Sequence, residues 1–380
     1  MIRPISFMSG IVYKYLAKPL LFRRKPDDVH AKLLKAGTRM QRYAIIRKLL
    51  HASWAYNNEA ALSQDMHGLH FKNPVGLSAG FDKNFELAPL LKSIGFGFME
   101  GGSVTFHPCD GNPRPWFYRL PKTKSLVVYA GLANEGVKKI VKRIKGYPAH
   151  TFDDFVMNIS VAKTNSKQAA SEAEAINDYL GSIEHIQREN IGDILTLNIS
   201  CPNTYGGEPF TTPQRLEKLL SAVDKHGLTQ PVFIKMPSNL EWDDFRKLLL
   251  IIVQHTVAGV TISNLQKDRS KANLKDELPD SVKGNLSGKP TWEASNMLIR
   301  KTYEEFGNKL TIIGVGGIFS AEDAYTKIKL GASLVELITG MIFEGPQLIG
   351  QINSGLTKLL QQDGYQNISE VIGTDVKPGC

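Results

Sequence analysis

The stretch LTIIGVGGIFSAEDAYTKIKLGASLVELITG, residues 310–340, contains two short apolar runs separated by a segment of helical periodicity. Both runs, LTIIGVGGI (310–318) and SLVELITG (333–340), are rich in leucine and β-branched residues, as buried strands are. Ser320 is a good N-cap for the intervening segment, which is long enough to connect two parallel strands through a helix. The stretch therefore predicts one strand–helix–strand unit of a parallel sheet.

The same alternation occupies the chain from residue 73 onward. Eight apolar runs, separated by segments of helical periodicity, predict strands at 73–80, 97–105, 155–161, 193–200, 231–237, 258–264, 310–318 and 333–340. Eight units agree with a (β/α)8 TIM barrel, which needs roughly 250 residues plus insertions. An open, doubly wound α/β sheet is the alternative, but no G-x-G-x-x-G follows the first strand. We therefore expect an N-terminal helical extension over 1–65 and a barrel over 66–370.

The composition is that of a globular protein, with 380 residues of which 42% are hydrophobic. No run approaches the roughly 18 consecutive apolar residues of a membrane-spanning helix. The three cysteines, Cys109, Cys201 and Cys380, are too few and too irregularly spaced for a disulfide framework or a metal site. These features predict a protein of the reducing cytoplasm that holds no metal.

The positive charge is concentrated near the N-terminus. Residues 1–50 contain 12 Lys and Arg against Asp27 and Asp28, whereas the rest of the chain has 34 basic and 35 acidic residues. Large apolar residues alternate with these cations, which favours an amphipathic helical arm on an anionic membrane surface. A helix packed on the main domain is the alternative interpretation. The rest of the chain has no basic patch for nucleic acid, and Lys14 and Lys18 interrupt any secretory signal. We expect a peripheral protein on the cytoplasmic face of a membrane.

Polar residues and glycines follow the expected strands, and in a barrel these strand ends meet at one mouth. They are Asn158, Asn198, Cys201, Lys235, Ser263, Asn264, Gly316, Gly317, Thr339 and Gly340. Glycines after the last two strands predict a phosphate cradle, because backbone N–H groups at a helix start hold an anion. The ligand could be a sugar phosphate, pyridoxal phosphate or flavin mononucleotide (FMN). The lysines could form a Schiff base or hold negative charge on a flavin.

Seven motifs, in chain order, resemble those of the dihydroorotate dehydrogenase family. They are NPVGLSAGFDKN, GFGFMEGGSVT, GNPRPWFYRLP, NISCPNT, GNLSGKP, IIGVGGIFSAEDA and GASLVELITGMIFEGP. The N-terminal FRRKPDDVHAKLLKAG is similar to the extension of the class 2 branch, whose members use quinone and associate with membranes. The resemblance implies an FMN-dependent oxidation of dihydroorotate to orotate in pyrimidine biosynthesis, with electrons passed to quinone.

The resemblance also implies site residues. FMN would contact Ala79, Gly80, Lys83, Ser103, Asn158, Asn198, Lys235, Ser263, Gly288, Gly317, Ile338 and Thr339. The substrate would contact Lys83, Asn198, Asn203 and Asn264, while His30 and Arg119 correspond to a quinone tunnel. Cys201 occupies the place of the catalytic base. A thiol has an ordinary pKa near 8.5, so we expect Cys201 to ionise near neutral pH.

Four residues depart from the class 2 pattern. Cys201 stands where that pattern has serine, Val128 where it has asparagine, Leu265 where it has threonine and Asn285 where it has glycine. Val128 and Leu265 fall at substrate-binding positions, which favours a second hypothesis of a related flavin oxidoreductase acting on another cyclic amide or enoate. A flavin-free aldolase or isomerase using Lys83 or Lys235, and a non-catalytic flavin-binding protein, are further alternatives.

Overall fold

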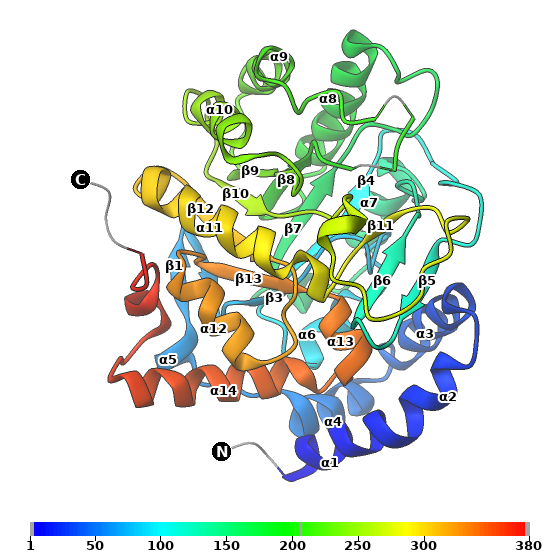
Figure 1. Ribbon diagram of the computed structural model, residues 1–380, viewed down its shortest axis with the longest axis vertical. Coiled ribbons are helices and arrows are strands. Elements are labelled where there is room, and N and C mark those ends of the chain that lie inside the picture. Colours follow the sequence, from blue (N-terminus) through cyan, green and yellow to red (C-terminus); the bar gives the residue numbers. More distant parts are fainter. Residues whose placement is uncertain (1–3, 202, 206, 377–380) are drawn as a thin grey trace.

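The computed structural model describes residues 4–201, 203–205 and 207–376. Its centre is a closed barrel of eight parallel strands, in the spatial order β10-β12-β13-β3-β4-β7-β8-β9 (Figure 1). Their bounds are β3 (Val75–Leu77), β4 (Phe98–Val104), β7 (Val156–Val161), β8 (Ile194–Asn198), β9 (Val232–Lys235), β10 (Gly259–Ile262), β12 (Thr311–Val315) and β13 (Leu334–Leu337). Each lies inside one expected strand, so the predicted TIM barrel is confirmed and the open sheet is wrong.

Helices surround the barrel, as the helical periodicity predicts. They are α6 (Ala88–Ser93), α7 (Val137–Lys145), α8 (Glu172–Arg188), α9 (Pro213–Asp224), α10 (Trp242–Ile252), α11 (Trp292–Phe306), α12 (Ala321–Lys329), α13 (Thr339–Glu344) and α14 (Leu348–Asp363). Ser320 caps α12 as expected, because its Oγ accepts a hydrogen bond from the Asp323 backbone N–H at 3.2 Å. Buried leucines and isoleucines on the inner faces of these helices pack on the outside of the strands and form most of the core.

The barrel interior has two layers of different polarity. The lower layer is apolar and consists of Phe98, Val156, Ile194, Phe233, Ile313 and Leu334, with Phe71 packed beneath it. Side chains two residues apart on a strand face the same side, so the next inward positions form the layer above. That layer is polar and contains Glu100, Asn158, Thr196, Lys235, Thr261 and Glu336, all of them buried. The apolar layer therefore separates the polar layer from water at the bottom of the barrel.

Helices also fill the N-terminal extension. They are α1 (Pro4–Val12), a π-helical turn (Tyr13–Ala17), α2 (Lys18–Phe22), α3 (Pro26–Met40), α4 (Ala44–Trp54) and α5 (Glu59–Leu62). Figure 1 shows α1 to α4 together on one side of the barrel, next to α13 and α14. Among the described residues, no helix combines the length and the apolar character needed to cross a membrane.

Two small sheets were not predicted. The hairpin of β1 (Gln64–Met66) and β2 (Leu69–Phe71) brings Phe71 under the barrel, where its ring meets Phe98 edge-on at 5.6 Å. The antiparallel sheet β11-β6-β5 consists of β5 (Phe117–Leu120), β6 (Ser125–Val128) and β11 (Asn285–Leu286). Residues of β5 and β6 line the main cavity at the strand ends, together with residues of α3.

Candidate active site

Two adjoining cavities lie at the C-terminal ends of the barrel strands. The larger, of about 210 Å³, reaches from the barrel mouth to α3 and β5. The smaller, of about 100 Å³, lies against the ends of β10, β12 and β13. Seven residues line both: Ala79, Lys235, Asn264, Leu265, Ser287, Ile338 and Thr339. The two cavities therefore form one continuous site.

The structure brings almost all of the predicted site residues to this site. The larger cavity is lined by His30, Gly80, Lys83, Ser103, Arg119, Asn198, Cys201 and Asn203, and the smaller by Ser263, Gly288 and Gly317. Asn158 lines neither cavity. It lies in the polar layer of the barrel, where its Oδ1 accepts a hydrogen bond from Thr196 Oγ1 at 3.0 Å.

The smaller cavity has the backbone of an anion cradle. Gly316 and Gly317 have φ of 116° and 73°, which side-chain-bearing residues rarely adopt. A Cβ on Gly316 would lie 2.5 Å from Thr291 Oγ1, and one on Gly317 would lie 2.9 Å from Trp292 Cβ. The turn therefore requires two glycines and leaves its backbone bare toward the cavity, which fits a phosphate group.

Lys235 stands at the junction of the two cavities. Its Nζ donates hydrogen bonds to Glu100 Oε2 at 2.9 Å and to Ser78 Oγ at 3.3 Å. Burial alone would lower the pKa of Lys235, but Glu100 and Glu336 outweigh it and raise that pKa. An ammonium has three N–H donors, so one is left for a ligand. Ser263 Oγ and Asn158 Nδ2 are buried without a partner among the described residues. The spare N–H of Lys235, Ser263 Oγ and the glycine cradle line the cavities and fit an FMN ring and its phosphate, whereas Asn158 lies in the polar layer of the barrel.

Lys83 is a second cation at the site. Its Nζ lies 5.7 Å from the Trp116 ring centre and 5.4 Å from that of Phe117. Burial lowers the pKa of Lys83 to about 8. Within the described part of the chain it has no hydrogen bond to an anion, so a carboxylate ligand would supply the missing partner.

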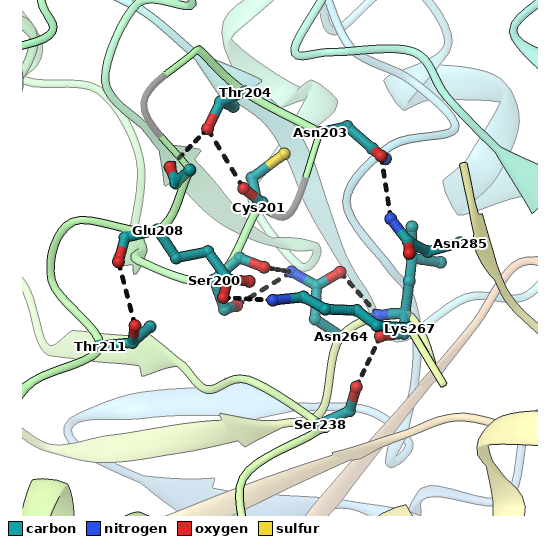
Figure 2. A network of polar contacts seen from close by, with 12 residues as sticks. Ser200, Cys201, Asn203, Thr204, Glu208, Thr211, Ser238, Asn264, Lys267 and Asn285 are labelled. Carbon is teal, nitrogen blue, oxygen red and sulfur yellow. Dashed lines mark hydrogen bonds and ion pairs between the residues drawn. The ribbon is translucent and has the colours of Figure 1, made fainter. Parts of the chain in front are cut away.

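Three asparagine amides on the cavity wall are bonded to the protein itself. Asn198 Nδ2 donates to Ser103 Oγ at 2.8 Å, and Asn264 Nδ2 donates to Ser200 Oγ at 2.9 Å. Asn203 Nδ2 donates to the Val128 carbonyl at 3.0 Å. Figure 2 shows the Asn203 and Asn285 side chains pointing toward each other, and Asn203 Oδ1 accepts from Asn285 Nδ2 at 2.9 Å. The Asn203 amide is thus held on both sides by residues that depart from the class 2 pattern, through the backbone of Val128 and the side chain of Asn285.

Cys201 follows β8 and begins a loop on the cavity wall. Thr204 Oγ1 donates to the Cys201 carbonyl at 3.3 Å, and no dashed contact in Figure 2 reaches the sulfur. Lys163 Nζ donates to the Tyr205 carbonyl at 2.8 Å and so holds the loop from below. Burial raises the pKa of the Cys201 thiol to about 11, and a hydrogen bond from the Asn203 backbone N–H and the charge of Lys163 oppose that shift only partly. The expectation that this thiol ionises near neutral pH is therefore wrong.

The chain matches a family model described as dihydroorotate dehydrogenase over residues 61–360. This chain belongs to the dihydroorotate dehydrogenase family. It is 33% identical to a dihydroorotate dehydrogenase (quinone) of Nostoc punctiforme over 96% of this chain and 99% of that protein. It is 35% identical to one of a Cyanothece species over 93% of this chain and 96% of that protein. A ligand-free dihydroorotate dehydrogenase from Eimeria tenella superposes with a TM-score of 0.80 at 26% identity, over 90% of this chain and 99% of that one.

Family membership makes the chain an oxidoreductase, which disfavours the flavin-free aldolase or isomerase. In this member of the dihydroorotate dehydrogenase family, the larger cavity continues from Cys201 to the N-terminal extension. Pro26, Val29, His30 and Leu33 of α3 line its outer end. His30 packs edge-on against Phe81 and Phe117 at 5.3 and 5.6 Å between ring centres. Burial lowers the pKa of His30 to about 3, so its imidazole is neutral. A passage lined by apolar side chains and a neutral imidazole, with Arg119 on its wall, suits a quinone.

Two features of the site escape the sequence analysis. One is the bond between Asn203 and Asn285, which joins the Cys201 loop to the sheet β11-β6-β5. The other is a pair of buried carboxyls, with Glu336 on the wall of the smaller cavity and Glu100 lining neither cavity. Glutamates inside the apolar strand runs at 97–105 and 333–340 are the signal that could have revealed the second feature.

Proposed function

We propose that the chain catalyses the FMN-dependent oxidation of dihydroorotate to orotate and passes the electrons to a membrane quinone. The observation that carries the proposal is one continuous cavity that joins the diglycine turn, Lys235, Cys201 and α3. A phosphate cradle, a base and an apolar exit are thereby aligned along a single path.

The chain's own residues have distinct tasks in this proposal. Lys83 holds the substrate carboxylate, and the Cys201 thiolate removes the C5 proton. The diglycine turn and Lys235 would hold FMN, which would supply an acceptor for the hydride from C6 and a two-electron donor for the quinone, with two protons taken up by the quinone. Lys235 holds negative charge at the flavin ring. His30 and Arg119 border the passage for quinone; Arg119 Nη1 donates to the Arg24 carbonyl at 2.7 Å and so joins the passage to the extension.

A second candidate function is the oxidation of a less polar cyclic amide or enoate. Val128 and Leu265 present apolar side chains to the larger cavity. The Asn203 amide is bonded to the Val128 carbonyl and to Asn285. A ring with imide groups would desolvate polar atoms against this wall, at a cost of about 1–3 kcal/mol for each unpaired group. That cost corresponds to roughly one decade of affinity per 1.4 kcal/mol.

Spectroscopy separates the two functions. We expect the purified chain to be yellow with bound FMN, and we expect dihydroorotate to bleach that colour without oxygen. Under the second candidate, the wild-type flavin stays oxidised, whereas the V128N/L265T variant gains reduction by dihydroorotate by roughly tenfold or more, since the wall regains polar partners. Ile342→Thr adds a hydroxyl elsewhere in the same cavity and serves as the control. A colourless protein that takes up no FMN would contradict both functions.

We further propose that α1 and α2 lie on an anionic membrane surface, at the cytoplasmic face. The exposed apolar side chains of these helices and of the π-helical turn between them are Ile5, Phe7, Met8, Ile11, Val12, Tyr15, Leu16 and Leu20. The charges of the extension would add roughly 1 kcal/mol per basic residue near the surface. Removing residues 1–50 is a poor test, because Asp27 bonds the backbone N–H of Trp116 at 3.0 Å and α3 lines the cavity.

Point substitutions test the membrane surface without disturbing the cavity. Leu16 and Leu20 are each 62% exposed, and burying a leucine in an apolar phase contributes about 1.5–3 kcal/mol. We expect L16E/L20E to lower sedimentation with anionic vesicles by at least about tenfold. Leu250→Glu, at an exposed leucine of α10 across the barrel in Figure 1, should leave it unchanged. If the full chain does not sediment with such vesicles at any ionic strength, the proposed contact with a membrane is excluded.

A further inference from the structure

Two carboxyl groups and one ammonium lie together inside the barrel, at the floor of the site. Glu100 and Glu336 are fully buried, and Lys235 is 4% exposed. Each follows by two positions an apolar residue of the lower layer, namely Phe98, Leu334 and Phe233 respectively. Water therefore has no path to them from below, and a bound cofactor would cover them from above. An isolated charge in such a place is costly, so the charges in this layer must balance.

The layer has too few hydrogen-bond donors for its carboxyl oxygens unless one carboxyl carries a proton. Lys235 Nζ donates to Glu100 Oε2 at 2.9 Å. Glu100 Oε1 and both carboxyl oxygens of Glu336 are buried without a donor among the described residues. Two carboxylates are acceptors only, and neither can satisfy the other. Burial, followed by the neighbouring Glu100, raises the pKa of Glu336 well above its ordinary value, whereas Lys235 and Ser78 oppose the shift.

We propose that Glu336 is a positioning residue that holds one proton at neutral pH and shares it with Glu100. The layer then contains one ammonium and one negative charge, and it is neutral. Lys235 remains a full ammonium with one N–H directed to the cavity. The titratable groups that face this pair are Lys235 and, through Lys235, Cys201. The other polar side chains of the layer, Asn158, Thr196 and Thr261, do not ionise.

The proton on Glu336 affects how well the cavity accommodates a negatively charged ligand. If Glu336 loses it at alkaline pH, the layer gains one negative charge below the cavity. A ligand that becomes negative on reduction, as a flavin ring does, would then be opposed rather than supported. The proton assignment is independent of the cofactor, while this consequence rests on the proposed function.

The cofactor-free protein tests the proton directly. Infrared spectra at pH 7 should contain the carbonyl band of a protonated carboxylic acid that shifts when the chain is labelled with ¹³C-glutamate. Glutamate labelling separates this band from buried Asp82, whose pKa is raised to about 6 by burial. The band should disappear in Glu336→Gln, which keeps the shape and a donor but cannot ionise, and it should persist in Glu184→Gln on the exposed face of α8. A spectrum without this band in the unsubstituted chain would overturn the proposal, even if the variant failed to fold.

Two pH dependences test the positioning role. The folded chain keeps a proton that the unfolded chain releases near pH 4 to 5, so the stability contribution is present at low pH and is lost as pH rises through the folded-state pKa. Relative to Glu336→Gln, the wild-type unfolding constant should grow by up to about tenfold per pH unit from about pH 5 up to the folded-state pKa, and it should level off above that pKa. The ratio of wild-type to variant dissociation constants for reduced FMN should grow once the pH exceeds the folded-state pKa, because the layer gains its negative charge only there. Ratios that stay flat would overturn the role, whereas failure to bind FMN at all would refute the proposed function and leave the unfolding test in force.

Discussion

Cys201→Ala should slow the reduction of bound flavin by substrate about 10²–10⁴-fold, the usual range for loss of a general base. FMN and substrate should bind nearly as in the wild type, because the side-chain amides of Asn198, Asn203 and Asn264 are held by partners other than Cys201. The measurement is anaerobic stopped-flow reduction with a substrate that reduces the wild-type flavin. Because chemistry is affected and binding is not, the limiting rate should fall while the half-saturating concentration changes little.

The pH profile gives the same test an independent readout. Burial raises the pKa of Cys201 to about 11, so roughly one thiol in a thousand is ionised at pH 8 in the unliganded site. The active thiolate gains as pH rises, so the wild-type rate should climb by up to about tenfold per pH unit until it approaches that pKa. Cys201→Ser should fall between wild type and alanine and lose this limb, since a hydroxyl ionises far less readily than a thiol.

Cys109 supplies the matched control. It is buried like a core residue, and its thiol lies 3.6 Å from the Gly131 carbonyl, outside the larger cavity. Cys109→Ala should leave the reduction rate and the pH profile unchanged. If Cys201→Ala reduced its flavin at the wild-type rate, the thiol would only fill space, and another group would have to remove the proton.

The barrel was predictable because each of its strands leaves a local signal. Short β-branched runs such as those at 258–264 and 310–318 are bounded by turn residues and separated by segments of helical periodicity. Parallel pairing of such runs needs no information beyond their order, since each crossover helix returns the chain in the same direction. The strand ends, and with them most of the site, follow from this topology alone.

The sheet β11-β6-β5 was not predictable in the same way. Asn285 pairs with Val128 across more than 150 residues of sequence, and β11 has only two residues. No local period encodes such a pairing. The bond between Asn203 and Asn285 depends on it, so the restraint on the Asn203 amide becomes visible only in three dimensions.

The polar layer could be predicted from the sequence only in part. Glu100 and Glu336 read as members of apolar runs, and strand periodicity predicts that each faces the same side as the residues two positions away. The contact between them depends on closure of the barrel, because β3 separates β4 from β13 in the strand order. Lys235 comes from the opposite side of the same ring of strands and reaches Glu100 across the interior.

Lys235→Ala should have two large effects, on cofactor binding and on the barrel itself. The resemblance places Lys235 against FMN, so this variant should lose or greatly weaken FMN binding while the barrel stays folded. The structure adds a cost in stability, because Glu100 and Glu336 would lose the ammonium between them. Removing one partner of a buried ion pair costs about 3–5 kcal/mol. We therefore expect a clear fall in the urea midpoint of the cofactor-free variant, together with loss of bound FMN.

The pH dependence of that loss identifies its cause. Without Lys235, the folded state is stable only if both carboxyls are protonated. Folding therefore takes up protons, and the free energy of unfolding falls as pH rises. The deficit should be large at pH 8 and smaller at pH 5. Lys235→Ala combined with Glu100→Gln removes one charge along with its partner and should recover much of the stability at pH 8 but none of the FMN binding, because the free N–H at the cavity junction is still missing. If Lys235→Ala alone kept the wild-type urea midpoint and full FMN content, the ammonium would neither balance the charge of the carboxyls nor hold the flavin.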